Sequence, residues 1–273
     1  MSRVCVNIAC GASYVDGWVN LDYSPSSPAV TKANLLERLP LDAAAVDVLY
    51  SSHFVEHIPR KQLNAFLAEC HRVLKSGGQI RLVLPDLDEL CREYLRRRDA
   101  GEHEKADFVV LEMLDQCVRA QPGGDLAEYY RHIISAHVQD MVNYITTRTG
   151  EDFSGWGCRT EAESRPRWLQ ALLQPSRLWA RIERLYCQMV TALLPAAFRA
   201  QNVSFAFVGE RHAWVYDFHS LSGLLEQAGF VHVRRQHCNQ TEIVEFPLYP
   251  LDINQDGLPR KGQGSMYLEA RKP

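Results

Sequence analysis

The sequence lacks most features that would direct a protein to a membrane, an oxidising compartment or a nucleic acid. Its 273 residues hold 30 Lys and Arg against 33 Asp and Glu, so no general attraction to nucleic acid or anionic lipid is expected. The eight cysteines include no Cys-x-x-Cys pair, which indicates reduced thiols. The longest apolar stretch, residues 189–198, is too short to span a bilayer and contains Pro195. With no basic leader and apolar segment at the start, we expect a cytoplasmic protein.

Near its start the sequence contains a strand, a tight loop and a second strand that ends in a carboxylate. The first strand, residues 4–9, ends in small residues, and the second, residues 18–22, ends at Asp22. Small residues let a ligand approach the backbone, and an acidic residue after the next strand can bind a ribose. Only residues 11–17 separate the strands, too few for a helix, so the first crossover is predicted to be truncated. Taken alone, the pattern is equally typical of an ordinary strand–loop–strand unit.

The rest of the chain alternates strands with helices and then changes character. A strand at 46–50, apolar residues at helical spacing over 63–74 and a strand at 80–85 indicate a parallel sheet. Residues 87–210 show helical periodicity and no strand signal. We therefore predict an α/β domain made of residues 1–86 and 211–273, with 87–210 as a helical insertion. Because it is the only segment large enough to exclude water, the insertion is expected to form a lid over the active site.

Six short segments, in this order and spacing, resemble those of class I S-adenosylmethionine-dependent methyltransferases. They are residues 7–11, 18–22, 47–57, 70–78, 210–217 and 228–230. The similarity is to the small type-11 branch, often associated with polysaccharide and natural-product clusters, and it covers about 1–90 and 205–273. It implies a Rossmann-like methyltransferase sheet that binds S-adenosylmethionine. Ala9 departs from the pattern, since the family usually has its first glycine there.

The resemblance also implies which residues bind the cofactor. Residues 9–12 would border the methionine portion, Asp22 would bind both ribose hydroxyls, residues 34–35 would meet the adenine, and 51–53 would line the sulfonium side. The candidates are Asn7, Ala9, Cys10, Gly11, Ala12, Asp22, Tyr23, Asn34, Leu35, Ser51, Ser52 and His53. A carboxylate supports the Asp22 assignment, because its two acceptor oxygens match the two donors of a vicinal diol. The alternative is that Asp22 caps a turn.

Residues 53–57 also match His-x-x-Glu-His, the inverted zincin pattern of a zinc peptidase. That mechanism needs both histidines one turn apart on a helix, plus a third ligand. Here the segment directly follows a strand, and Pro59 lies where a continuing helix needs a free N–H. We therefore expect no metal, with His53 facing the ligand. Glu56 and His57 would begin or cap the next helix. The sequence fits a structural role for His57 as well as a functional one.

Other candidates lie on later elements. The candidate catalytic residues are His53, Asp86 and His212, and the candidate substrate or lid contacts are Tyr130, Asn143, Tyr144, Trp214 and Tyr216. Asp86 ends a strand, where it could orient an acceptor or cap the following helix. Positions 212, 214 and 216 alternate, so one strand face would carry all three side chains, either as a packed edge or as an aromatic wall that attracts a sulfonium. Most aromatics of the insertion are expected to be core.

The leading function is methyl transfer from S-adenosylmethionine to a small molecule or sugar, by in-line displacement that depends on positioning. The alternative is a methyltransferase-like cyclase, in which the amine of S-adenosylmethionine attacks its own γ-carbon to give azetidine-2-carboxylate and methylthioadenosine. A third possibility is a protein that binds the cofactor without catalysing a reaction. The partners expected are a small-molecule acceptor, or none beyond the cofactor, with no nucleic acid and no membrane. The sequence leaves open the acceptor and whether the chain forms a homodimer.

Overall fold

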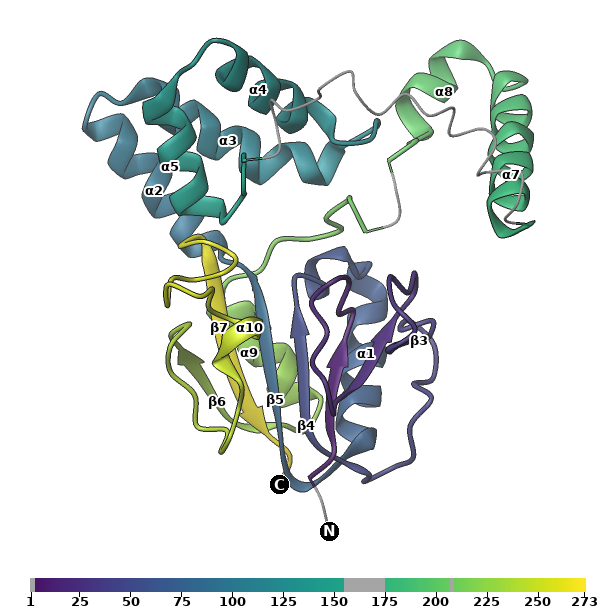
Figure 1. Ribbon diagram of the computed structural model, residues 1–273, viewed down its shortest axis with the longest axis vertical. Coiled ribbons are helices and arrows are strands. Elements are labelled where there is room, and N and C mark those ends of the chain that lie inside the picture. The colour runs from purple at the N-terminus through teal and green to yellow at the C-terminus, as the bar shows by residue number, and fades with distance from the viewer. Residues whose placement is uncertain (1–2, 155–174, 207–208) are drawn as a thin grey trace.

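The computed structural model describes residues 3–154, 175–206 and 209–273. One sheet has the strand order β3-β2-β1-β4-β5-β7-β6 (Figure 1). Its strands are β1 Cys5–Ile8, β2 Val19–Asp22, β3 Val30–Lys32, β4 Val46–Ser52, β5 Leu74–Pro85, β6 Val231–Gln236 and β7 Ser265–Arg271. The first five run parallel, whereas β7 lies antiparallel between β5 and β6. The predicted Rossmann-like methyltransferase sheet is thus confirmed, and the three-residue strand β3 is an addition, because the sequence predicts only turn and loop between residues 22 and 46.

The first crossover is truncated, as predicted. The described loop between Ile8 and Val19 contains no helix and is held by two buried asparagines. Asn20 accepts the Val15 N–H at 3.1 Å and donates to the Val15 carbonyl at 2.9 Å, while Asn7 donates to the Ser13 carbonyl at 3.0 Å. These bonds replace the internal hydrogen bonds that a crossover helix would have supplied.

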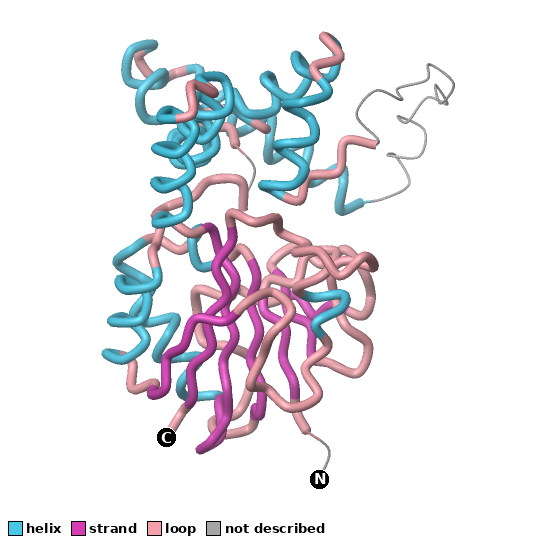
Figure 2. Tube along the Cα trace, turned by 90° about the vertical axis from the view of Figure 1, so that its left-hand side faces the viewer, coloured by secondary structure: helices cyan, strands magenta, loops and turns pink. Residues whose placement is uncertain are grey.

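The two faces of the sheet are covered differently (Figure 2). Helices α1 Arg60–Val73 and α9 Phe218–Gln227 bury apolar stripes against one face. The other face is covered by residues 237–264, which contain only the short helix α10 Leu248–Leu251. The Phe246 ring packs there, 5.9 Å from Trp18 and 5.5 Å from Tyr50 between ring centroids. A long connection thus does the packing that crossover helices do elsewhere.

A buried arginine ties this connection to the sheet. Arg81, in the middle of β5, has no exposed surface and donates from Nε to Asp252 Oδ2 at 2.7 Å. Its Nη1 donates to Glu269 Oε1 at 2.5 Å on the neighbouring strand β7. Tyr50 Oη donates to the other Asp252 oxygen at 2.8 Å. The charges are therefore paired, as burial requires.

The helical insertion follows β5 directly. It contains α2 Leu87–Asp99, α3 His103–Val118, α4 Gly124–Ser135, α5 Gln139–Thr149, α7 Pro175–Ala192 and α8 Ala196–Asn202. Figure 1 shows α2 to α5 above the carboxyl ends of the parallel strands, with α7 and α8 to one side. The part of the predicted lid that can cover these strand ends is therefore α2 to α5. No helix in the described ranges has the length and apolar character needed to cross a membrane.

Candidate active site

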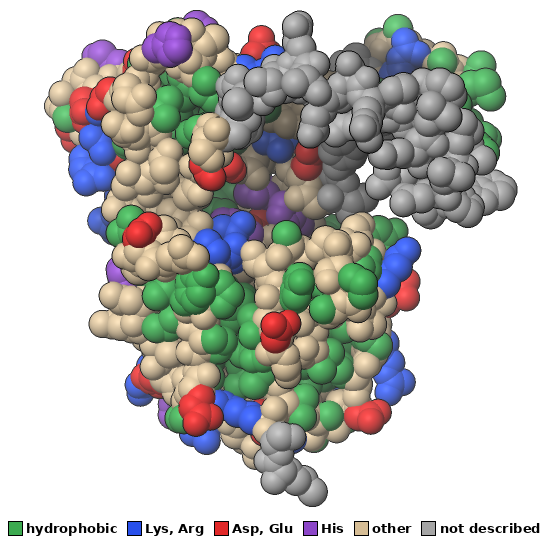
Figure 3. All heavy atoms as spheres, in the orientation of Figure 1, with side chains coloured by type: hydrophobic (Ala, Val, Ile, Leu, Met, Phe, Trp, Pro, Cys, Tyr) green, Lys and Arg blue, Asp and Glu red, His purple; other side chains and the backbone are tan. Residues whose placement is uncertain are grey.

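A cavity of about 340 Å³ lies between the carboxyl edge of the sheet and the helical insertion. Its floor comes from the ends of β4 and β5 and from residues 261–265, and its upper wall comes from α3, α4 and α5. In Figure 3 histidine side chains are visible in the hollow between these two parts. Open α/β sheets place their ligands at this edge, so the cavity has the position of an active site.

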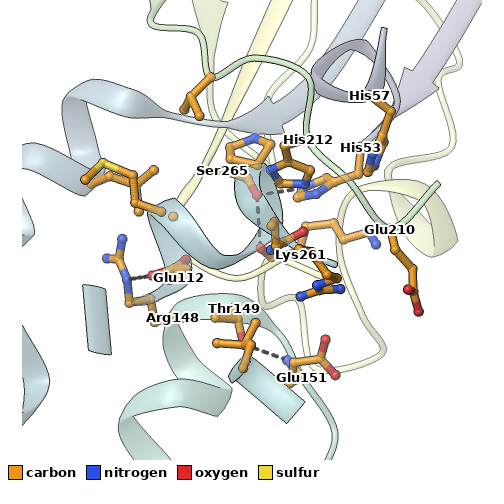
Figure 4. Close-up of a pocket in the computed structure, with 18 of the residues that line it drawn as sticks. His53, His57, Glu112, Arg148, Thr149, Glu151, Glu210, His212, Lys261 and Ser265 are labelled. Carbon is orange, nitrogen blue, oxygen red and sulfur yellow. Dashed lines mark hydrogen bonds and ion pairs between the residues drawn. The ribbon is translucent and has the colours of Figure 1, made fainter. Parts of the chain in front are cut away.

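The end of β4 directs His53 into this cavity. His53 follows the strand with φ 52°, a left-handed conformation that is costly for a residue with a Cβ. Its Nε2 lies 3.0 Å from Ser265 Oγ, and that hydroxyl donates to the Lys261 carbonyl at 3.0 Å (Figure 4). The backbone turn and the serine together fix the ring at the cavity floor.

Three further side chains meet beside His53. One ligand atom each of Glu56, His57 and His212 lies within 4.8 Å of the others. Glu56 is 1% exposed, and neither of its oxygens accepts a hydrogen bond within the described part of the chain. His57 and His212 have edge-to-face rings 4.8 Å apart between centroids. The cluster joins the short 3₁₀ turn η1 Val55–His57 to a segment more than 150 positions later.

Burial shifts the titration of this cluster. It raises the pKa of the Glu56 carboxyl to about 8. Burial, followed by the neighbouring His57 and Arg119, lowers the pKa of His212 to about 3. The pKa values of His53 and His57 are also lowered, again mainly by burial. The three imidazoles are therefore uncharged near neutral pH and offer nitrogen lone pairs.

The cavity wall carries fixed charges from the insertion. Arg148 Nε donates to Glu112 Oε2 at 2.5 Å, and Arg119 Nε donates to Asp115 Oδ2 at 3.0 Å. Lys261, on the opposite side, makes no ion pair within the described ranges, and burial lowers its pKa. A polar ligand entering this space would meet donors and acceptors on several sides.

The cofactor candidates gather at the ends of β1 and β2. Ala9 and Gly11 both have φ 55°. Because positive φ favours glycine, this angle explains why similar methyltransferases usually have glycine at the position of Ala9. The two oxygens of Asp22 accept the N–H groups of Gly11 at 2.9 Å and Ser24 at 2.7 Å. Asp22 thus caps this turn, and because each carboxylate oxygen has two lone pairs, it keeps acceptor capacity for a diol.

The remaining cofactor candidates differ in accessibility. Ala12, Tyr23 and Asn34 are exposed, and Ala9 is partly buried, whereas Asn7, Cys10 and Leu35 are buried. At the end of β4, the buried Ser51 Oγ has no hydrogen-bond partner in the described part of the chain, as expected where a polar ligand binds. Ser52 follows it, at the last position of the strand. These positions fit S-adenosylmethionine, whose amino-acid and ribose groups need polar partners at this edge.

Several predicted site residues lie away from the cavity. Asp86 is fully buried, caps α2 through the Asp88 N–H at 3.1 Å and forms an ion pair with Arg235. Asn143 is exposed and accepts a hydrogen bond from Gln139 at 2.8 Å. Tyr144 donates to Glu93 Oε1 at 2.9 Å. Among the candidates in the insertion, Tyr130 does line the cavity.

The predicted strand through 212, 214 and 216 does not form. Only Tyr216 makes an isolated bridge, to Asp86, and its ring is buried in the sheet core. Trp214 is 43% exposed and packs under the Arg60 guanidinium, 4.6 Å from the ring centroid. The reason is that the backbone N–H groups of Ala213 and Trp214 donate to the Glu56 carbonyl and not to a neighbouring strand. Of the three, only His212 lines the cavity.

The inverted zincin pattern requires both histidines on one helix, and residues 53–57 form no such helix. His53 is left-handed, and the following residues form one 3₁₀ turn, so His53 and His57 do not share a helix face. Sequence reasoning missed Glu112, Arg148 and Lys261, which carry no local motif. Glu56 and His57 could have been found, because buried titratable residues directly after a central strand are typical of functional sites.

Comparison with known proteins gives one family match and a set of similar solved structures. Residues 16–82 match the family model described as a methyltransferase domain, of type 11. A SAM-dependent methyltransferase from Archaeoglobus fulgidus is 12% identical, with 99% of this chain and 86% of that chain covered and a TM-score of 0.41. The complex of the Haloferax volcanii Trm112 methyltransferase activator with a putative methyltransferase gives 11% identity, coverage of 99% and 83%, and a TM-score of 0.40. No curated protein sequence matches.

The sheet order and the family model define the class of protein. The chain has a class I methyltransferase fold, with the ligand edge at the ends of β1, β2 and β4. Over residues 16–82 the chain is similar to the type-11 methyltransferase domain, which supports an S-adenosylmethionine-dependent transferase with S-adenosylmethionine as its cofactor.

Proposed function

We propose that the protein transfers the methyl group of S-adenosylmethionine to a small polar molecule, such as a sugar or a natural-product intermediate, bound in the cavity. The observation that carries this proposal is the position of His53. It belongs to the residues expected on the sulfonium side of the cofactor, and its side chain also lines the cavity. A volume of about 340 Å³ suits a ligand of roughly monosaccharide size.

The lining of the cavity supports a polar acceptor. Glu112, Gln116, Arg148, Glu151 and Lys261 all contribute to its wall. Hydroxyl or amine groups of an acceptor would find hydrogen-bond partners there, which would orient the attacking atom toward the methyl group. Helices α3 to α5 would act as the lid that keeps water from the reaction.

The cyclase alternative uses the same cofactor but needs no acceptor. A cyclase must fold the aminobutyrate chain back so that its own amine reaches the γ-carbon. A cavity with polar groups on several sides favours an external acceptor over this reaction. The test is to incubate the protein with S-adenosylmethionine alone and analyse the products by mass spectrometry. Methyl transfer predicts almost no turnover, whereas rapid formation of methylthioadenosine with azetidine-2-carboxylate would establish the cyclase and overturn our proposal.

A cavity variant tests where the acceptor binds. Gln116 on α3 lines the cavity wall, far from the Asp22 turn in the chain. We expect Gln116→Leu to lower methyl transfer to an acceptor found by screening sugars and small polar metabolites, while cofactor affinity stays unchanged. Unchanged acceptor kinetics in a folded Gln116→Leu protein would place the acceptor elsewhere.

A further inference from the structure

We propose that Glu56, His57 and His212 form a binding site for a divalent transition-metal ion in the wall of the cavity. Their candidate ligand atoms lie within 4.8 Å of one another, and the set of two imidazoles and one carboxylate is common for Zn²⁺ and related ions. Bonds of about 2.0–2.2 Å would draw these atoms closer together. From the sequence we expected no metal here, and the geometry of these three side chains replaces that expectation.

The buried carboxylate is the first independent sign of a ligand. Glu56 is 1% exposed, and neither oxygen accepts a hydrogen bond in the described part of the chain, although His53 Nδ1 lies 3.3 Å from Oε1. A buried carboxyl group without a hydrogen-bond partner is costly in either protonation state, and coordination of a metal ion is one way in which proteins satisfy it. A metal ion between Glu56 and the two histidines would satisfy it.

The histidine ligands are also held in place. His57 Nδ1 donates to the Arg211 carbonyl at 2.8 Å, which leaves Nε2 as its free ligand atom. The backbone N–H of His212 donates to the Gln116 carbonyl at 2.9 Å, and the backbone N–H of Ala213 donates to the Glu56 carbonyl at 2.7 Å. One framework of hydrogen bonds therefore positions the turn η1 and residues 211–213 together.

Three protein ligands leave at least one coordination position open. His57 and His212 both line the cavity, so the open position would face the space in which an acceptor is proposed to bind. An ion there could hold and polarise an acceptor hydroxyl, as Lewis-acid metals do. This role rests on the proposed function, whereas the metal site itself does not.

The test measures metal binding directly, without S-adenosylmethionine or acceptor. Protein freed of metal by chelation is titrated with Zn²⁺ by calorimetry and with Co²⁺ by visible absorption. We expect one ion per chain and a Co²⁺ band typical of nitrogen and oxygen ligands. His57→Ala, His212→Ala and the isosteric Glu56→Gln should each weaken binding at least about 100-fold. His132→Ala, at an exposed histidine on α4, is the matched control and should bind as the wild type does.

The outcomes separate the possibilities. Absence of stoichiometric binding to the wild type would overturn the proposal. So would full binding by folded Glu56→Gln and His57→Ala proteins, which would place the ion elsewhere, for instance at the exposed thiols of Cys91 and Cys187. If circular dichroism shows that an alanine variant is unfolded, the Glu56→Gln variant still decides the question. Metal binding with no methyl transfer to any acceptor would contradict the proposed function alone.

Discussion

The sheet and the helical insertion are stabilised by different interactions. A continuous apolar cluster joins β1, β2, β4, β5 and β7 to helices α1 and α9. In the insertion, the apolar cluster is much smaller and centres on Phe108, Tyr130 and Ile145. Polar contacts also join its helices, among them Lys105 of α3 with Asp140 of α5 at 3.0 Å and Tyr144 of α5 with Glu93 of α2 at 2.9 Å.

This difference separates a rigid part of the molecule from one that can open. Buried apolar surface contributes about 25 cal/mol per Å², whereas exposed ion pairs contribute about 0–1 kcal/mol each and weaken with salt. The sheet should therefore hold the cofactor edge in one conformation, while the insertion unfolds or moves at lower cost. The following predictions test the contrast, from the largest expected effect to the smallest.

Removing the buried positive charge of Arg81 from the sheet should lower the free energy of unfolding more than any other change. Arg81→Ala would leave Asp252 and Glu269 buried without their counter-charge and should lower the free energy of unfolding by about 3–5 kcal/mol. Urea denaturation measures it. Lys75→Ala, which breaks a partly exposed pair with Asp47, is the control and should cost less than about 1 kcal/mol. Equal effects for the two variants would remove the distinction between buried and exposed charges.

Asp22→Ala tests the cofactor end of the sheet. A charge-assisted hydrogen bond is worth about 1.5–3 kcal/mol, so S-adenosylmethionine should bind about tenfold to a few hundredfold more weakly. Titration calorimetry gives the affinity, and circular dichroism checks the turn, because Asp22 also accepts the Gly11 and Ser24 N–H groups. Unchanged affinity in a folded variant would remove the ribose assignment.

In the insertion, Glu93→Gln should lower the free energy of unfolding by about 1–2 kcal/mol. Glu93 is buried and accepts hydrogen bonds from Arg96, Arg97 and Tyr144, which an amide oxygen can replace only in part. Asp88→Asn, in the exposed pair with Arg92 on the same helix, should change stability by less than about 0.5 kcal/mol. Hydrogen exchange should show the loss in α2 to α5 and leave the sheet unchanged. Uniform loss of protection would show that both parts unfold together.

Lowering the pH should destabilise the insertion gradually, because Glu93 becomes protonated. Burial alone would raise the pKa of Glu93, but the hydrogen bonds from Arg97, Arg96 and Tyr144 prevail and lower it from 4.5 to about 2. Its contribution to stability is therefore complete above about pH 4.5 and is lost as the pH falls toward 2. Hydrogen exchange of α2 between pH 5 and pH 3 checks this, and in Glu93→Gln this part of the pH dependence should disappear.

The sequence by itself determined the sheet apart from β3, the truncated first crossover and the similarity to class I methyltransferases. These features depend on short-range patterns: apolar strands, the spacing of Leu63, Phe66, Leu67 and Cys70 on one helix face, and a loop too short for a helix. Asp22 could be identified for the same reason, since its place after the second strand follows from chain order alone. Its role toward the cofactor stays a prediction.

Only the tertiary structure decided what surrounds the cavity. His212 and Glu56 meet because residues 212–214 donate their backbone N–H groups across the molecule, which no local periodicity encodes. The same contact prevents the strand that alternation predicted around Trp214. Lys261 reaches the cavity from the long connection that Arg81 ties to the sheet. Contacts between segments so far apart depend on how the whole chain packs, and therefore Glu112, Arg148 and Lys261 could not be predicted from the sequence.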